Sequence, residues 1–200
     1  MDTVTPFIDK LDKHPFVFNK AIKLLVLFDS LLYLSSSFLS PIFAIFVERV
    51  GGGVVEAGWA SAIFYFVSGL LIFAWGKLID QTKEKELWLM FGYLIIASGY
   101  FMYLFVDSVW KLFLVEVVLA IGTSIQNPSF KTLFSIHLDK GREGQEWGLW
   151  ESLTYFTMGI GAACGGMIVM AFGFHALLVI MGSITLANAV CIYFLPRRVL

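Results

Sequence analysis

The chain has 200 residues, 58% of them hydrophobic, and a mean hydropathy of +0.82. Soluble domains hold about 45–50% apolar residues, so this composition excludes a water-soluble globule. Charged residues make up 14% of the chain and gather between apolar runs, which is typical of a protein that crosses a membrane several times. The formal net charge is -1, and we expect no nucleic-acid partner.

Six apolar runs, each near the ~20 residues that a spanning helix needs, follow one another along the chain. We predict transmembrane helices at 22–47, 56–79, 87–106, 109–136, 147–171 and 174–195. The predicted transmembrane domain, 21–195, lies between a polar leader at 1–20 and a short tail at 196–200. The leader has no apolar segment with a small-residue cleavage site, so we expect no cleaved signal peptide.

Lysine and arginine are unevenly distributed over the connections. If the leader is cytoplasmic, 12 of the 14 basic residues fall on the cytoplasmic side, and only Arg49 and Lys111 fall outside. Cytoplasmic loops carry an excess of these residues. We therefore expect an integral protein of the cytoplasmic (inner) or plasma membrane, with both termini cytoplasmic.

The first run is unusually polar for a membrane helix. Four residues share one face at helical spacing: Asp29, Tyr33, Ser36 and Ser40. A carboxylate at membrane depth is costly and normally faces a bundle interior or a watery cavity. We expect this face to bind a substrate or protons, and a structural hydrogen-bonding role for Asp29 is the alternative.

The fourth run has a similar polar face, made by Glu116, Thr123, Asn127 and Lys131. Pro128 removes the backbone bond to Ser124 and frees a carbonyl, and freed carbonyls are tolerated where they line a cavity. We expect Glu116, Thr123 and Asn127 to join the substrate- or proton-binding face. A plain proline kink, and a Glu116 that reaches the interface, are the alternatives.

The second connection reads Gly76-Lys-Leu-Ile-Asp80-Gln-Thr-Lys83-Glu-Lys85. A glycine followed by an aspartate four residues later and then by basic residues resembles the loop signature of the major facilitator superfamily. Gly76, Asp80 and Lys85 match that signature, whereas Gln81 and Lys83 replace its basic residue and second glycine. The first run, with Leu34-Ser35 and then Pro41, is similar to the family's leucine-glycine…proline pattern.

The fifth run contains Gly161-Ala-Ala-Cys-Gly165-Gly166, which resembles the glycine-proline-x-x-glycine-glycine motif of facilitator antiporters with Ala162 in place of proline. Small residues let helices approach closely, so we expect Gly161, Gly165 and Gly166 to pack against another helix, either within the chain or in a second subunit. The fourth run has Gly122 and Asn127-Pro128, as family members often do, but lacks their arginine.

The resemblance implies an all-α membrane protein with six helices arranged as 3+3 inverted repeats, which is half of the facilitator fold. It further implies a secondary transporter that rebuilds the twelve-helix fold as a homodimer and works by alternating access. A cytoplasmic loop network would control the inner side, and its expected members are Gly76, Asp80, Lys85, Lys131, Arg142 and Glu151.

The driving force and the solute follow from the residue types present. No Walker loop occurs, and two membrane-embedded carboxylates make proton coupling the leading mechanism. Aromatic residues (Phe38, Phe64, Tyr65, Tyr155) and scarce mid-membrane basic residues favour a small amphipathic or cationic solute. No cysteine spacing predicts a disulfide or a metal site, and no cofactor is expected.

Other classes of protein remain as alternatives or are excluded. No Gly-x-Ser-x-Gly or His-Glu-x-x-His motif occurs, so an intramembrane enzyme is not expected. A water channel would need two Asn-Pro-Ala-like half-helices, and only Asn127-Pro128-Ser129 is present. A non-transporting scaffold or assembly partner, and an isolated N-terminal half of a longer transporter, stay open.

Overall fold

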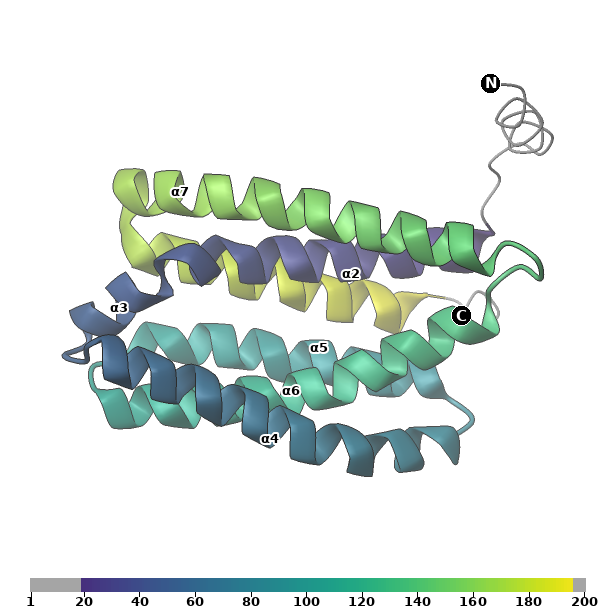
Figure 1. Cartoon of the computed structure of the whole chain (residues 1–200), viewed down its shortest axis with the longest axis horizontal. Helices are drawn as coiled ribbons and strands as arrows, with labels where there is room; N and C mark the ends of the chain where they lie inside the picture. The colour runs from purple at the N-terminus through teal and green to yellow at the C-terminus, as the bar shows by residue number, and fades with distance from the viewer. Residues whose placement is uncertain (1–18, 196–200) are drawn as a thin grey trace, which may run out of the picture.

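The computed structural model describes residues 19–195, and in these residues the only regular elements are helices (Figure 1). Five of the helices are long and apolar enough to cross a membrane. Almost all of the predicted leader and the whole of the predicted tail lie outside the described residues. The fold is therefore an all-helical membrane bundle.

Two of the long helices begin where a side chain caps the backbone. Asn19 accepts the backbone N–H of Ile22 (2.8 Å) and starts α2 (Lys20–Leu39). Glu56 accepts the backbone N–H of Gly53 (2.8 Å) at the start of α4 (Val54–Asp80). The remaining elements are η1 (Ser40–Ile42), α3 (Phe43–Arg49), α5 (Lys85–Met102), η2 (Tyr103–Phe105), α6 (Val109–Ile136) and α7 (Glu143–Phe194).

The first predicted span, 22–47, falls within one candidate membrane span, Lys20–Arg49, but it is not a continuous α-helix. Pro41 has no backbone N–H to continue the α-helical hydrogen bonds, so the chain tightens into η1 and resumes as α3. The third predicted helix, 87–106, agrees with the candidate span Lys85–Phe105, whose last turn is the 3-10 helix η2 from Tyr103. The bounds of α6 coincide with the predicted 109–136.

The predicted fifth and sixth helices, 147–171 and 174–195, fall within the single element α7 of 52 residues. Gly173 interrupts it with φ 79° and ψ 171°, a backbone conformation that glycine adopts without steric cost. In Figure 1 the chain turns back on itself between the green and yellow parts of α7. The two parts of α7 are therefore two separate helices on either side of Gly173.

Each long helix packs mainly on helices that are distant from it in the sequence, apart from the neighbouring pair α5 and α6. α2 makes its main contacts with α7, while α6 packs on α4 and α5, and α5 also packs on α7. Glycines permit the closest approaches: a Cβ on Gly92 would lie 2.7 Å from the Gln126 backbone nitrogen, and one on Gly122 would lie 2.8 Å from that of Ile96. These contacts hold α5 against α6 through the middle of the bundle.

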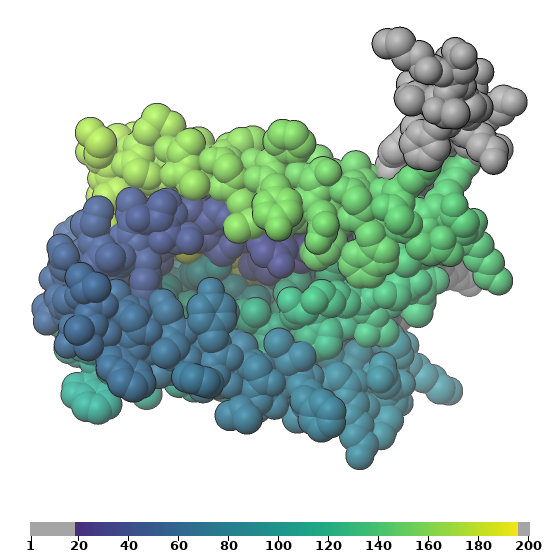
Figure 2. All heavy atoms as spheres, in the orientation of Figure 1, coloured from purple at the N-terminus to yellow at the C-terminus, as the bar shows by residue number. Residues whose placement is uncertain are grey.

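The outer surface of α4 is almost entirely apolar. Only three of its 27 residues, Ala60, Ser68 and Ile79, are buried within the chain. Phe66, Leu70 and Phe73 are among its exposed side chains. In the face drawn in Figure 2, α4 (blue) forms one ridge and the green part of α7 forms the other, with a hollow between them. Surfaces of this kind suit lipid or another membrane helix.

Candidate functional site

Asp29 lies deep inside the bundle and is only 2% exposed. Its Oδ1 accepts a hydrogen bond from Gln126 Nε2 of α6 (2.9 Å), and its Oδ2 accepts one from Trp150 Nε1 of α7 (2.6 Å). One carboxylate thus joins three helices. Because both oxygens are bound by groups of the same chain, Asp29 is covered in this conformation.

An aromatic cluster surrounds the Asp29 contacts. Trp150 packs on Phe130 and on Trp147, with ring centroids 5.4 Å apart in both pairs, and Phe134 lies 4.7 Å from Trp147. Such aromatic pairs add about 0.5–1.5 kcal/mol beyond the burial of their surface. The rings exclude water from one end of α2 and fix the Trp150 donor.

Glu116 is the second membrane-embedded acid, and it is 5% exposed. Its Oε1 accepts a hydrogen bond from the hydroxyl of Tyr103 (2.5 Å) in η2. Its Oε2 accepts no hydrogen bond from residues 19–195 and is not a fully enclosed atom. Unlike Asp29, Glu116 keeps one oxygen free for a ligand.

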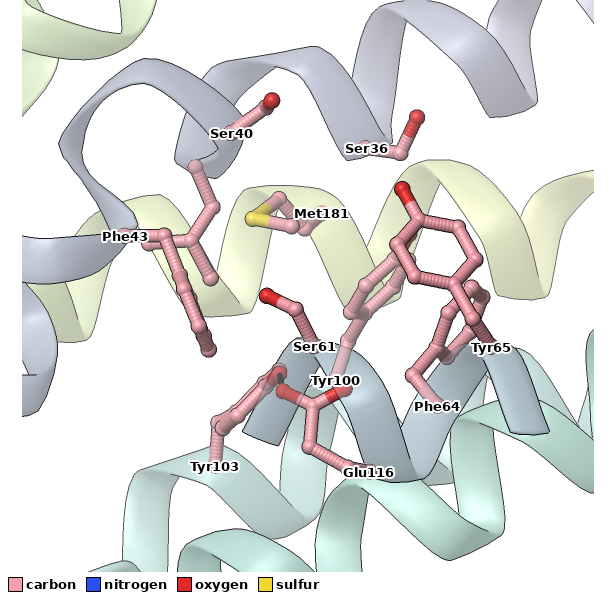
Figure 3. A pocket seen from close by; sticks show the side chains of 11 residues that line it. Ser36, Ser40, Phe43, Ser61, Phe64, Tyr65, Tyr100, Tyr103, Glu116 and Met181 are labelled. Carbon is pink, nitrogen blue, oxygen red and sulfur yellow. Dashed lines mark hydrogen bonds between the residues drawn. The ribbon is translucent and has the colours of Figure 1, made fainter. Parts of the chain in front are cut away.

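That free oxygen belongs to a cavity of about 240 Å³ between α2 and α4. Figure 3 shows Ser36 and Ser40 on one side of it, Ser61 and Tyr65 on the other, and Met181 behind. The lining residues are Ser36, Leu39, Ser40, Phe43, Ser61, Phe64, Tyr65, Tyr100, Tyr103, Glu116 and Met181.

The cavity combines one carboxylate, several hydroxyls and several aromatic rings. Among the described residues no Lys, Arg or His lines it. Aromatic faces attract cations that lie within about 6 Å of the ring, and a carboxylate supplies a full negative charge. The arrangement suits an organic cation and repels an anion.

The structure brings together only part of the polar set expected from the sequence. Ser36, Ser40 and Glu116 share the cavity, whereas Asp29 lies apart from it within the aromatic cluster. Tyr33, Thr123 and Asn127 are half-buried on α2 and α6. Of the two predicted faces, only Ser36, Ser40 and Glu116 therefore line the cavity.

The residues of the predicted loop network do not contact one another as a group. Asp80, Lys131 and Glu151 are exposed, and Arg142 is half-buried. Within the described chain no hydrogen bond or ion pair joins two members of this set; Lys85 Nζ instead donates to the carbonyl of Thr82 (2.7 Å). Gly76 has open space around it.

The predicted packing glycines separate into two kinds. A Cβ on Gly161 would lie 2.7 Å from the carbonyl oxygen of Leu34, and one on Gly165 would lie 2.0 Å from that of Phe38. Both glycines therefore press against α2 of the same chain. Gly166 has no neighbour within 4 Å.

Sequence reasoning missed three residues that complete the acidic sites: Gln126, Trp150 and Tyr103. Gln126 stood beside the predicted Asn127, one step round the helix. Trp150 and Tyr103 look like interfacial aromatics, because each lies near one end of an apolar run. Only the helix packing shows that their donor groups point at carboxylates.

A family model described as Major Facilitator Superfamily matches residues 25–199. An uncharacterised MFS-type transporter from Methanocaldococcus jannaschii is 23% identical over 160 residues, which is 80% of this chain. The chain spans 41% of that relative's length.

Proposed function

This chain belongs to the Major Facilitator Superfamily, and on that basis we propose that it is a six-helix unit of a secondary transporter whose two copies build one alternating-access pathway. Members of this family are transporters and not enzymes, and the chain is an integral membrane protein. The proposed solute is a small amphipathic or cationic molecule, and the proposed coupling ion is the proton.

Six crossings in 3+3 inverted repeats are supported by two features. With a rise of 1.5 Å per residue, the 52 residues of α7 would extend about 80 Å, far more than the ~30 Å hydrocarbon core, unless Gly173 turns the chain back. The packing is also reciprocal. The first helix of each proposed repeat, α2 or α6, packs on the second and third helices of the other repeat.

The Glu116 cavity is the observation that carries the proposed transport function. It presents a carboxylate oxygen with no donor from the described chain, and tyrosine and serine hydroxyls surround it. An ammonium group placed there would gain a charged partner and aromatic contacts while its apolar parts contact Phe43 and Phe64. We propose Glu116 as the residue that binds the solute.

Proton coupling is supported by the lack of a direct ion pair at either membrane-embedded acid. No basic side chain of residues 19–195 forms an ion pair with Asp29 or Glu116. A carboxylate at membrane depth must be neutralised by a partner, and a proton or a cationic solute can each do this. We propose that the two compete at Glu116, which links proton movement to solute movement.

A homodimer is proposed because one unit leaves the cavity open at its surface. The cavity is bordered by α4, whose exposed side chains are largely apolar, and a second copy packed on α4 would enclose it. The chain also spans less than half of the relative that it matches. A half of a longer transporter has the same support, whereas a non-transporting scaffold leaves the polar cavity without a role.

The cytoplasmic loop would then work between the copies. Asp80 ends α4 and is exposed at the same end of the bundle where α7 begins at Glu143 (Figure 1). The amino end of a helix attracts anions. We propose that Asp80 docks at the partner's α7 and closes the inner side, with Lys85, Lys131, Arg142 and Glu151 as the surrounding charges.

Uptake into liposomes tests this function. Purified protein under an imposed pH gradient is expected to accumulate radiolabelled tetraethylammonium, and Glu116→Gln is expected to abolish the accumulation. Glu48→Gln, which changes an exposed acid outside both the cavity and the loop network, is the matched control. Equal uptake by wild type and Glu116→Gln would contradict the proposed site.

A further inference from the structure

α2–α3 and α6 carry the same pattern of residues, 87 positions apart. Asp29 corresponds to Glu116, and Pro41 corresponds to Pro128. Between and beyond these pairs, Ser36-Ser37 corresponds to Thr123-Ser124, and Phe43 to Phe130. The two membrane-embedded acids therefore occupy one position of an internal repeat.

The helices that follow also repeat, now 90 positions apart. Five identical pairs link α4 with the first part of α7: Glu56 and Glu146, Gly58 and Gly148, Tyr65 and Tyr155, Phe66 and Phe156, Gly69 and Gly159. Further along, Gly92 pairs with Gly182, and Tyr103 with Tyr193. The register thus holds through all three helices of each repeat.

The two internal repeats, which start at α2 and α6, run in opposite directions through the bundle. α2 and α6 begin at opposite ends of the bundle (Figure 1), and each acid lies within the first ten residues of its helix. Asp29 is therefore near one end of the bundle and Glu116 near the other.

The surroundings of the two acids correspond in part. Tyr193, the counterpart of the Tyr103 that donates to Glu116, is exposed and does not reach Asp29, whereas the residues that cover Asp29 have counterparts beside the open cavity. Gln126 and Trp150, which cover Asp29, correspond to Leu39 and Ala60, which have no donor group in their side chains. Leu39 lines the open cavity, as does Ser61, the neighbour of Ala60.

The aromatic residues agree with this correspondence. Phe130 packs on Trp150 beside Asp29, and its counterpart Phe43 lines the cavity beside Glu116. The indole of Trp150 and the amide of Gln126 therefore stand where the other repeat has the donor-free side chains of Ala60 and Leu39, at the edge of the cavity.

We propose that Asp29 is a second, covered copy of the Glu116 site, that it takes the same class of ligand, a small organic cation, and that Gln126 and Trp150 occupy it until the bundle opens at that end. The choice of a cation rests on the proposed function, whereas the duplication rests on the sequence register and the contacts. The chain then holds one acid for each end of the pathway.

Binding of radiolabelled tetraethylammonium to the purified full chain in detergent tests this. Wild type is expected to bind one cation per chain, and Glu116→Gln to bind none. The double variant Gln126→Leu, Trp150→Ala gives Asp29 the residues of its counterpart, and it is expected to bind a second cation. Adding Asp29→Asn to the double variant is expected to remove that second site.

Trp147→Ala is the control, because Trp147 belongs to the same aromatic cluster but makes no hydrogen bond to Asp29. A double variant that still binds one cation, or a second site that survives Asp29→Asn, would overturn the inference. If wild type binds none while the double variant gains an Asp29-dependent site, the proposed role of Glu116 fails and the duplicated site stands.

A single substitution at the Glu116 site tests the same correspondence and does not require the double variant to fold. Leu39→Gln places beside Glu116 the amide that Gln126 offers to Asp29, and it is expected to weaken wild-type cation binding by about tenfold. Leu39→Met keeps the volume without a donor and is expected to bind as wild type does. Equal binding by Leu39→Gln and Leu39→Met would overturn the correspondence.

Discussion

Trp150 donates its indole N–H to Asp29 over 2.6 Å, across 121 residues of sequence. The bond ties α7 to α2 at a depth where water is scarce, and Gln126 adds a bond from α6. A carboxylate that would be costly in the membrane is thereby satisfied by neutral donors. The contact explains how an acid can be buried here without a direct ion pair.

Trp150→Phe removes this donor and keeps an aromatic ring in the cluster. We expect the free energy of unfolding to fall by about 1–2 kcal/mol, because a buried carboxylate oxygen loses its hydrogen bond. Unfolding of the purified protein in mixed micelles measures the change.

Trp147→Phe is the matched control for this variant, since it makes a similar change in volume and leaves Asp29 bonded. If the two variants had equal free energies of unfolding, the hydrogen bond would make no measurable contribution to stability. The effect of Trp150 would then come from aromatic packing alone.

Gly165→Ala is expected to destabilise the protein by about 2 kcal/mol or more, because its Cβ would lie 2.0 Å from the carbonyl oxygen of Phe38. The backbone of α2 would have to move away from α7. Gly166→Ala, at a glycine with open space, is expected to have little effect. Thermal unfolding in detergent compares the pair, and a Gly166→Ala change as large as that of Gly165→Ala would be inconsistent with the packing described.

Ser61→Phe fills the cavity and leaves Glu116 unchanged. We expect it to abolish tetraethylammonium uptake, because the ring takes the space of the solute. Ser98→Phe adds the same ring to an exposed position of α5 and is expected to retain uptake. Normal uptake by Ser61→Phe would show that the solute binds elsewhere.

Cysteines at Asp80 and Gln145 test the proposed docking between copies. Both residues are exposed, whereas the nearby Glu146 is buried and would not be reached. In a chain with Cys164→Ser and Cys191→Ser, we expect oxidation to give disulfide-linked dimers on a gel. Asp80→Cys with Lys111→Cys, at the other end of the bundle, is expected to give none. Cross-links confined to single chains would argue against a latch between subunits.

The sequence predicted the elements whose ends are marked by local chemistry. The fourth helix has its predicted bounds because a polar loop precedes Val109 and a polar turn follows Ile136. Pro41 was visible too, but whether a proline kinks a helix or ends it depends on the packing around it, and here η1 forms. The turn at Gly173 agrees with the predicted break between the runs 147–171 and 174–195.

The site was only half predictable. Periodicity along α2 and α6 identifies Asp29 and Glu116 as polar residues on membrane helices. It does not say that Trp150 covers one acid or that Tyr103 holds the other. Those partners are set by which helices pack together, and that information is spread over long-range contacts.

Transport by single vesicles tests most directly whether two copies share one pathway. Chains labelled at the exposed Cys191, with Cys164→Ser, are reconstituted sparsely, and the chains in each vesicle are counted by photobleaching while its internal pH is recorded. We expect vesicles with one chain to show no tetraethylammonium-dependent proton flux and vesicles with two chains to show it. Flux in vesicles that hold a single chain, or its absence at every occupancy, would contradict the account.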